Sequence, residues 1–102
     1  MINLTRSNFD STISTGKNLV DFYTDWCGYC RMIEPAIEEL SAKYVGEVKV
    51  AKVDAGNERE IASRYGVTSF PTVIAFEDGK ETGRKIGAYP MEVFEEMIGS
   101  FR

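Results

Sequence analysis

Short apolar runs alternate with segments of helical periodicity along the whole 102-residue sequence. Residues 19–23 and 72–76 are rich in branched and aromatic side chains, as in strands that are buried on both faces. Three valines mark another strand over residues 47–54. Between these runs, apolar residues recur at helical spacing over residues 28–44, and again from Pro90 to the end of the sequence. The pattern predicts strands that are connected by helices.

Caps and breakers mark two shorter helices. Residues 7–10 resemble a capping box, which would open a short helix that ends near Ile13. Asn57 and Glu60 are placed to cap another short helix, and Gly66 is expected to stop it.

The order of these elements predicts the fold class. Asp78-Gly79 is a two-residue hairpin signal, so residues 81–87 should return antiparallel beside the preceding strand. With a short first strand near Leu4, the order is βαβαβαββα. Strands joined by helices favour parallel pairing, whereas a hairpin requires antiparallel pairing. We therefore predict an α/β fold with a central mixed β-sheet, helices on both faces, and a single domain over residues 1–102.

Composition argues against several kinds of partner. Lys and Arg number 12 against 16 Asp and Glu, and the basic residues are scattered, whereas nucleic acid binding needs a concentrated positive face. The absence of His excludes Cys/His and Ser/His catalysis and zinc sites with His ligands. The longest unbroken apolar run, residues 73–76, is far shorter than the roughly 18 to 20 residues that cross a bilayer. We expect no nucleic acid or membrane partner, and the absence of a secretory signal favours a cytoplasmic location.

Cys27 and Cys30 form the one strongly reactive group in the sequence. Cys27 lies where the strand at 19–23 leads into the helix at 28–44, and the free N–H groups and partial positive charge of a helix start favour a thiolate. Cys27 is therefore the predicted nucleophile. Cys30 lies one turn further along the same side, close enough to form a disulfide with Cys27 and to resolve a mixed disulfide there.

Other interpretations of the pair stay open. A tetrahedral zinc or iron–sulfur site needs four ligands, and two Cys without His supply them only if carboxylates or a second subunit contribute. A structural disulfide across so short a loop would constrain the unfolded chain little. Redox chemistry is favoured, with a dimeric metal or iron–sulfur module and a non-catalytic binding subunit as alternatives.

Several motifs accompany the cysteine pair in order, and with them the sequence resembles the thioredoxin family over essentially its whole length. The matching segments are Val20-Asp21-Phe22, Trp26-Cys27-Gly28 with Cys30, Met32-Ile33, Pro35, residues 50–54, Tyr65-Gly66-Val67, Phe70-Pro71-Thr72, Asp78-Gly79 and Ile86-Gly87-Ala88. The resemblance implies the thioredoxin fold and a monomeric reductase of disulfide-containing proteins. It also implies recharging by a thioredoxin reductase and a cis peptide bond before Pro71. No bound cofactor is required, because the disulfide itself stores the electrons. A disulfide oxidase or isomerase is the alternative within redox chemistry.

Asp21 lies inside an apolar strand, where a carboxylate is costly to bury. It is therefore expected to have a raised pKa or a partner, and either suits a proton acceptor. The resemblance implies that Asp21 lies behind the cysteines and takes the proton of Cys30; a hydrogen-bonded structural Asp is the alternative. Lys52 matches a lysine of the family that neighbours and modulates this carboxylate, and a solvated lysine at a strand end is the equal alternative.

The resemblance also implies a surface on which a substrate chain docks. Gly87 would let a peptide backbone approach closely, and the residue before Pro71 offers main-chain hydrogen bonds to an extended segment. For Trp26 and Phe70, ordinary core packing is the alternative. The expected substrate-binding residues are Trp26, Gly28, Tyr29, Phe70, Pro71 and Gly87.

Tyr29 departs from the family pattern, which most often has Pro at this position. Proline has no N–H, so Tyr29 restores a donor within reach of the Cys27 sulfur. We expect this donor to stabilise the thiolate and to make the disulfide somewhat more oxidising than in a relative with Pro.

Overall fold

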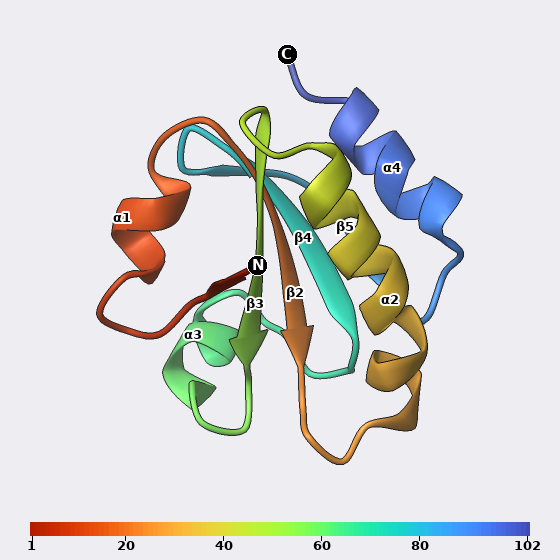
Figure 1. Ribbon diagram of the computed structural model, residues 1–102. Helices are drawn as coiled ribbons and strands as arrows, with labels where there is room; N and C mark the ends of the chain where they lie inside the picture. Colours follow the sequence, from red (N-terminus) through yellow and green to blue (C-terminus); the bar gives the residue numbers. More distant parts are fainter.

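The computed structural model describes residues 1–102 and contains strands and helices in the predicted order (Figure 1). Each strand expected from an apolar run and each helix expected from helical periodicity is present. The elements are β1 (Ile2–Asn3), α1 (Phe9–Ile13), β2 (Lys17–Tyr23), α2 (Gly28–Lys43), β3 (Val48–Asp54), α3 (Arg59–Arg64), β4 (Thr72–Glu77), β5 (Lys80–Ile86) and α4 (Met91–Gly99).

The five-stranded sheet is mixed, as predicted, with the strand order β1-β3-β2-β4-β5. β1, β3 and β2 run parallel, whereas β4 pairs antiparallel with β2, and β5 pairs antiparallel with β4. β2 is the central strand, and its Val20 lies opposite Ala51 of β3 and Ile74 of β4. The predicted hairpin joins β4 to β5, with φ values of 49° at Asp78 and 85° at Gly79, the positive values that such a turn requires.

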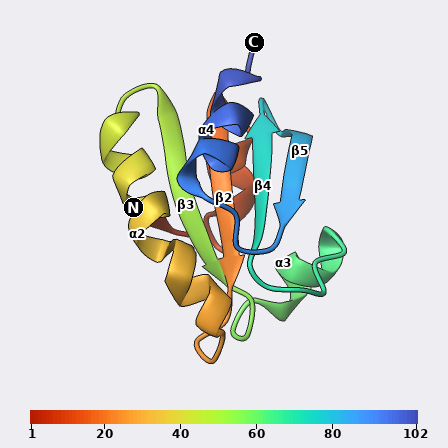
Figure 2. The same ribbon diagram turned by 90° about the vertical axis from the view of Figure 1, so that its right-hand side faces the viewer.

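Helices cover both faces of the sheet, α1 and α3 on one and α2 and α4 on the other (Figures 1 and 2). The hydrophobic core is divided accordingly into a cluster of 13 buried residues on the α1 and α3 side and one of 11 on the α2 and α4 side. Side chains alternate along β2, so that Val20 and Phe22 belong to the first cluster and Leu19 to the second. Asp21, two residues after Leu19, therefore faces the α2 side.

Two of the predicted helix caps are wrong. The capping box expected over residues 7–10 does not form: Asn8 is the N-cap residue of α1 but makes no side-chain cap bond, and its Oδ1 accepts the Thr5 N–H at 2.7 Å instead. Asn57 does not cap α3; its amide donates to Asp54 Oδ2 at 3.0 Å, and Glu58 is the N-cap residue. In both cases a nearby backbone or carboxylate group competes with the helix end for a short polar side chain.

The other helix ends are closer to expectation. Glu60 lies in the first turn of α3 without a side-chain cap bond, and the helix ends before Gly66, which has a φ of 65°. α4 begins directly after Pro90, as predicted, but it ends at Gly99 and does not reach the end of the chain. Phe101 therefore packs against the α2 and α4 cluster from the segment after the helix.

No helix of the structure combines the length and the apolar character that crossing a membrane requires.

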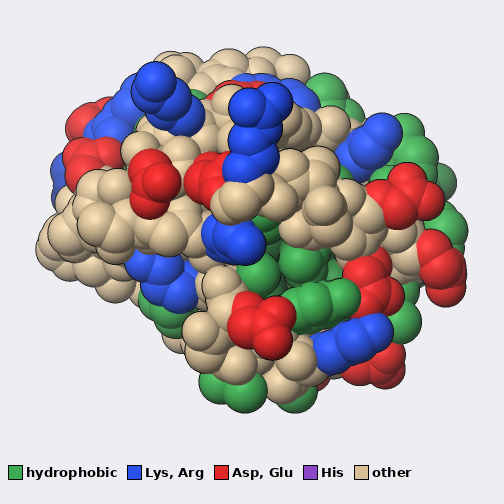
Figure 3. All heavy atoms as spheres, turned by 90° about the horizontal axis from the view of Figure 1, so that it is seen from above, with side chains coloured by type: hydrophobic (Ala, Val, Ile, Leu, Met, Phe, Trp, Pro, Cys, Tyr) green, Lys and Arg blue, Asp and Glu red, His purple; other side chains and the backbone are tan.

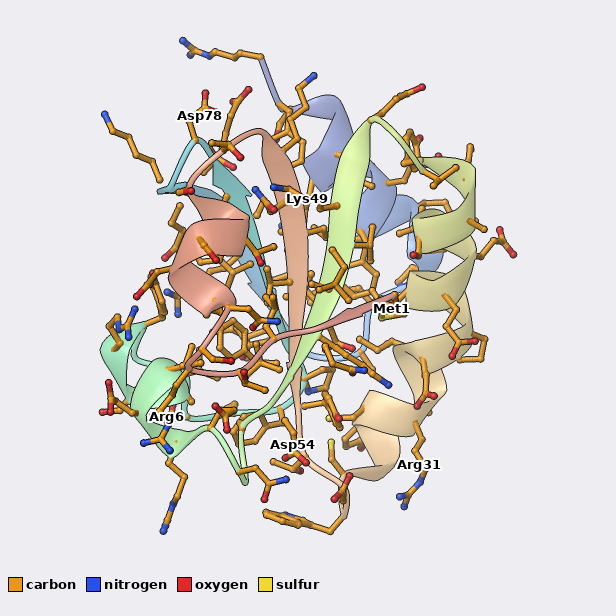
Figure 4. The ribbon with its side chains drawn as sticks, turned by 60° about the vertical axis from the view of Figure 1, so that its left-hand side comes forward. Met1, Arg6, Arg31, Lys49, Asp54 and Asp78 are labelled. Carbon is orange, nitrogen blue, oxygen red and sulfur yellow. The ribbon has the colours of Figure 1, made fainter.

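Figure 3 views the molecule from the end opposite the start of α2, the end at which Asp78 lies in Figure 4. On this face Lys and Arg side chains are intermixed with Asp and Glu side chains. The chemistry identified in the sequence lies at the other end, where β2 leads into α2.

Phe9 anchors α1 to the sheet. It is fully buried, and its ring centroid lies 6.3 Å from Phe22, 6.0 Å from Phe76 and 5.6 Å from Tyr65. We expect Phe9→Ala to lower the free energy of unfolding by about 3 to 5 kcal/mol, because it removes buried apolar contacts and leaves a cavity. Urea unfolding at constant pH measures the change, and Phe9→Leu, which retains most of the volume, should cost less than half as much. A loss below about 1 kcal/mol for Phe9→Ala would contradict this role.

Candidate active site

Cys27 lies where β2 leads into α2, and it is the N-cap residue of that helix. Its backbone is extended, with φ −93° and ψ 112°, and its Sγ accepts the Cys30 N–H at 3.1 Å. The same Sγ donates to the Phe70 carbonyl at 3.6 Å. A negative charge on this sulfur would be stabilised by the N–H group and by the partial positive charge of the helix start. The predicted position of Cys27 at a helix N-terminus is confirmed.

Cys30 lies one turn further into α2 and is buried, with 4% of its surface exposed. Both cysteines are free thiols. Burial, together with the smaller effect of the hydrogen bond with Cys27, raises the pKa of Cys30 to about 12, although a backbone hydrogen bond with Thr24 opposes the rise. The two thiols are therefore unequal: Cys27 is only half-buried, whereas Cys30 needs a base to ionise.

The Tyr29 backbone does not supply the hydrogen bond expected from the sequence. The N–H that reaches the Cys27 sulfur belongs to Cys30, the third helical residue, which is one of the two donors that an N-cap side chain normally engages. The expected effect of Tyr29 on the redox potential thus loses the donor on which it rested. The Tyr29 side chain is 64% exposed beside the cysteine pair.

Asp21 is buried on the α2 side of the sheet, and its Oδ1 has no hydrogen-bond partner. The pKa of Asp21 is raised from its ordinary value of 3.8 to about 7, and burial is the largest cause. The carboxylate of Glu34 also raises it, and the ammonium group of Lys52 lowers it by a smaller effect. The expected raised pKa of Asp21 is therefore present, whereas the alternative of a hydrogen-bonded structural Asp does not fit the unpartnered Oδ1.

Lys52 lies beside Asp21 in the sheet, since the two residues are register partners in the parallel pairing of β3 with β2. Its ammonium group does not form an ion pair with Asp21; it lies over the Tyr23 ring, 5.5 Å from the centroid. The charge therefore acts on Asp21 from a neighbouring position, without direct contact. Lys52 is half-buried and lines the same cavity as Asp21.

A cavity of about 190 Å³ brings Asp21, Cys30 and Lys52 together. These three residues were predicted from the sequence, and they come from β2, α2 and β3. Two further lining residues, Tyr23 and Glu34, were not predicted. Glu34 carries the one signal that could have identified it, because it lies four residues after Cys30 on the same helix and such residues are neighbours on a helix surface.

The residues expected to bind substrate lie around the cysteines on the surface. Trp26 is 76% exposed, so core packing does not explain it, whereas Phe70 is half-buried and packs against the α1 and α3 cluster. Trp26 and Phe70 are among the residues that line a groove of about 520 Å³, which extends to α3. The peptide bond before Pro71 is cis, as the resemblance implied. Gly87 has a φ of 122°, which favours glycine, and its N–H donates to the Pro71 carbonyl at 2.9 Å.

Charged side chains surround this end of the molecule. Figure 4 shows Asp54, at the end of β3, and Arg31, in the first turns of α2, at the end opposite Asp78. Arg31 Nη1 donates to the Asp25 carbonyl at 2.8 Å, which ties the loop before Cys27 to the helix. No three His, Cys, Asp or Glu side chains in the structure are arranged to hold a metal ion.

Comparison with known proteins gives one family. The family model described as Thioredoxin matches residues 1–100. A thioredoxin of Staphylococcus saprophyticus is 41% identical over 98 residues, which are 96% of this chain and 94% of that protein. A thioredoxin of Staphylococcus aureus is 39% identical with the same coverage. A solved structure of a mutant thioredoxin from Halobacterium salinarum superposes with a TM-score of 0.90 at 32% identity and covers 98% of this chain and 88% of that chain.

The raised pKa of Asp21 makes stability depend on pH. The folded chain holds the Asp21 proton more tightly than the unfolded chain, so this group stabilises the fold fully below about pH 4, and that stabilisation is lost as the pH rises to about 7. We compare the free energy of unfolding of Asp21→Asn with that of the natural protein. The difference should favour the variant by about 3 to 4 kcal/mol more at pH 8 than at pH 4. Urea unfolding of both proteins between pH 4 and pH 8 measures this, and a difference that does not change with pH would contradict the assignment.

Proposed function

Since the chain belongs to the thioredoxin family and is a protein-disulfide reductase, we propose that Cys27 is its nucleophile, Cys30 its resolving thiol and Asp21 the acceptor of the Cys30 proton. One observation carries this assignment: the two thiols differ in burial, and the buried one, whose pKa is raised, shares a cavity with an unpartnered carboxylate. Such an arrangement separates attack on a substrate from release of the product.

In the first step, the Cys27 thiolate attacks one sulfur of a substrate disulfide. A mixed disulfide forms between Cys27 and that sulfur, the substrate S–S bond breaks, and the other substrate sulfur leaves as a thiolate and takes a proton from water. The Cys30 N–H and the start of α2 support the attacking anion.

In the second step, Cys30 loses its proton to Asp21 and attacks the Cys27 sulfur. The mixed disulfide breaks, the second substrate sulfur leaves as a thiolate and takes a proton from water, and a Cys27–Cys30 disulfide forms, so two electrons have passed from the pair to the substrate. A pKa near 7 suits Asp21 for this transfer, because part of the population is ionised at neutral pH and the ionised group is a stronger base than an ordinary carboxylate. Lys52 is proposed to modulate this base from β3.

A substrate chain is proposed to dock across the exposed face of the cysteine pair. The exposed Trp26 ring supplies an apolar contact, and Gly87 has no side chain to obstruct an extended backbone. Main-chain groups next to Pro71 would pair with that backbone. The full set of proposed substrate-binding residues is Trp26, Gly28, Tyr29, Phe70, Pro71 and Gly87.

The cycle implies protein partners. Disulfide-containing proteins consume the electrons of the pair, and a thioredoxin reductase is the proposed donor that restores them. We propose that the chain is a monomeric single domain over residues 1–102 that works in the cytoplasm in electron transport and cell redox homeostasis. Nucleic acids and membranes are not proposed as partners.

The division of roles between the thiols is tested by trapping. Cys30→Ala should accumulate mixed disulfides on Cys27 when it is mixed with a disulfide-bonded protein, because the resolving attack is missing. The matched variant Cys27→Ala should trap little, since the remaining thiol is buried and needs a base. Non-reducing electrophoresis with mass spectrometry identifies the products. Equal trapping by both variants would contradict the assigned order, and trapping by neither would favour a metal module or a binding subunit.

The role of Asp21 is tested on the resolving step alone. We expect Asp21→Asn to slow release of the second thiol from a preformed Cys27 mixed disulfide about 10- to 100-fold at pH 7, because water must then accept the proton. The first attack, which needs no proton acceptor once Cys27 is ionised, should change less than about threefold. Stopped-flow measurement with an aromatic disulfide that releases a coloured thiolate separates the two steps. Equal slowing of both steps would indicate a structural effect of the substitution.

A further inference from the structure

Glu34 is a carboxylate at the mouth of the Asp21 cavity that the proposed mechanism does not use. It lies in α2, one turn after Cys30, and it follows the buried Ile33 and precedes the buried Ile37. The residue itself is exposed and forms neither an ion pair nor a side-chain hydrogen bond in the structure. Glu34 nevertheless lines the cavity that contains Asp21, Cys30 and Lys52.

Side chains of both charges line the cavity that contains Asp21. Lys52 comes from β3, Glu34 comes from α2, and the unpartnered Asp21 lies between these two elements on β2. Because Ile37 and the buried Asp21 are also part of the wall, the charges interact through less water than they would on an open surface. The other titratable or charged residues that line the cavity are Met1, Tyr23, Asp25, Cys30 and Arg31.

The opposing effects of the two nearest charges can be compared. The Glu34 anion disfavours ionisation of Asp21, and the Lys52 cation favours it, but the influence of Glu34 is the larger of the two. Without Glu34, the lysine would act on the carboxylate without this opposition. The anion at the cavity mouth therefore opposes the effect of Lys52 on the ionisation of Asp21.

We propose that Glu34 is a positioning residue for proton transfer, an anion that keeps the proton on Asp21 against the pull of Lys52 and so sets the pH at which Cys30 is deprotonated. The inference rests on the proposed role of Asp21 as base. In the transfer, the S–H bond of Cys30 breaks and an O–H bond forms on Asp21, while Glu34 exchanges no atom with either group. It acts on the balance between the two protonation states of Asp21.

The test is a direct titration of the Asp21 carboxyl carbon by NMR in the reduced protein. Glu34→Gln should lower the Asp21 midpoint by about half a pH unit, because it removes the anion and keeps the side-chain shape. Glu34→Lys should lower it further, since a cation then takes the place of the anion. Glu38→Gln is the matched control: it removes an exposed carboxylate from the same helix, outside the cavity, and should leave the midpoint within about 0.1 unit.

A kinetic measurement keeps this inference separate from the role of Asp21. In single-turnover release of the second thiol, the pH midpoint should fall in Glu34→Gln by the same half unit, and the shift should vanish in an Asp21→Asn background. An unchanged Asp21 titration in Glu34→Gln and Glu34→Lys, or an equal shift in Glu38→Gln, would overturn the proposal for Glu34. A different outcome is a shifted Asp21 titration together with a kinetic pH profile that Asp21→Asn does not change. That outcome would refute Asp21 as the base but would retain the electrostatic coupling between Glu34 and Asp21.

Discussion

The two-residue period of side chains along β2 determines where chemistry can take place in this molecule. Because β2 is paired on both sides, its side chains can point only toward α1 and α3 or toward α2 and α4. Apolar residues occupy both directions, and Asp21 takes one position on the α2 side. A shift of one residue along β2 would turn this carboxylate toward the other core cluster and away from Cys30.

The same geometry explains why the two sulfurs differ. Residue Cys27 ends the connection from β2 and caps α2, where backbone N–H groups are free to stabilise an anion. Residue Cys30 lies inside the first turn, on the face that packs against the sheet, where burial disfavours its ionised form. One helix start thus provides an environment suited to a thiolate and, three residues later, an environment suited to a protonated thiol.

The elements, the mixed sheet and the cysteine pair could be predicted from the sequence, because each depends on local periodicity or on the physics of a helix end. The place of Glu34 in the site could not be predicted, since a charged residue beside the apolar stripe of a helix is normally solvated. The cavity that Glu34 lines exists only after β2, β3 and α2 have assembled. The predicted caps were wrong for a related reason: Asn8, within the expected capping box, and Asn57, an expected cap of α3, form hydrogen bonds outside the two helix starts. The N–H expected to donate to the Cys27 sulfur was that of Tyr29, but the donor is Cys30. The capping geometry of α2 brings the Cys30 N–H to this sulfur.

The missing hydrogen bond on Asp21 suits the role of proton acceptor that we propose for this residue. A donor on Oδ1 would satisfy the buried carboxylate and stabilise the fold, but it would also favour the charged form and return the pKa toward its ordinary value. A carboxylate stabilised in that way would be a weaker base toward a thiol whose own pKa is raised to about 12. A repulsive anion at the cavity mouth acts in the opposite direction, since it strengthens the base without adding a partner. The instability of the ionised Asp21 and its capacity to accept a proton therefore have the same physical cause, and a substitution that relieves the first must weaken the second.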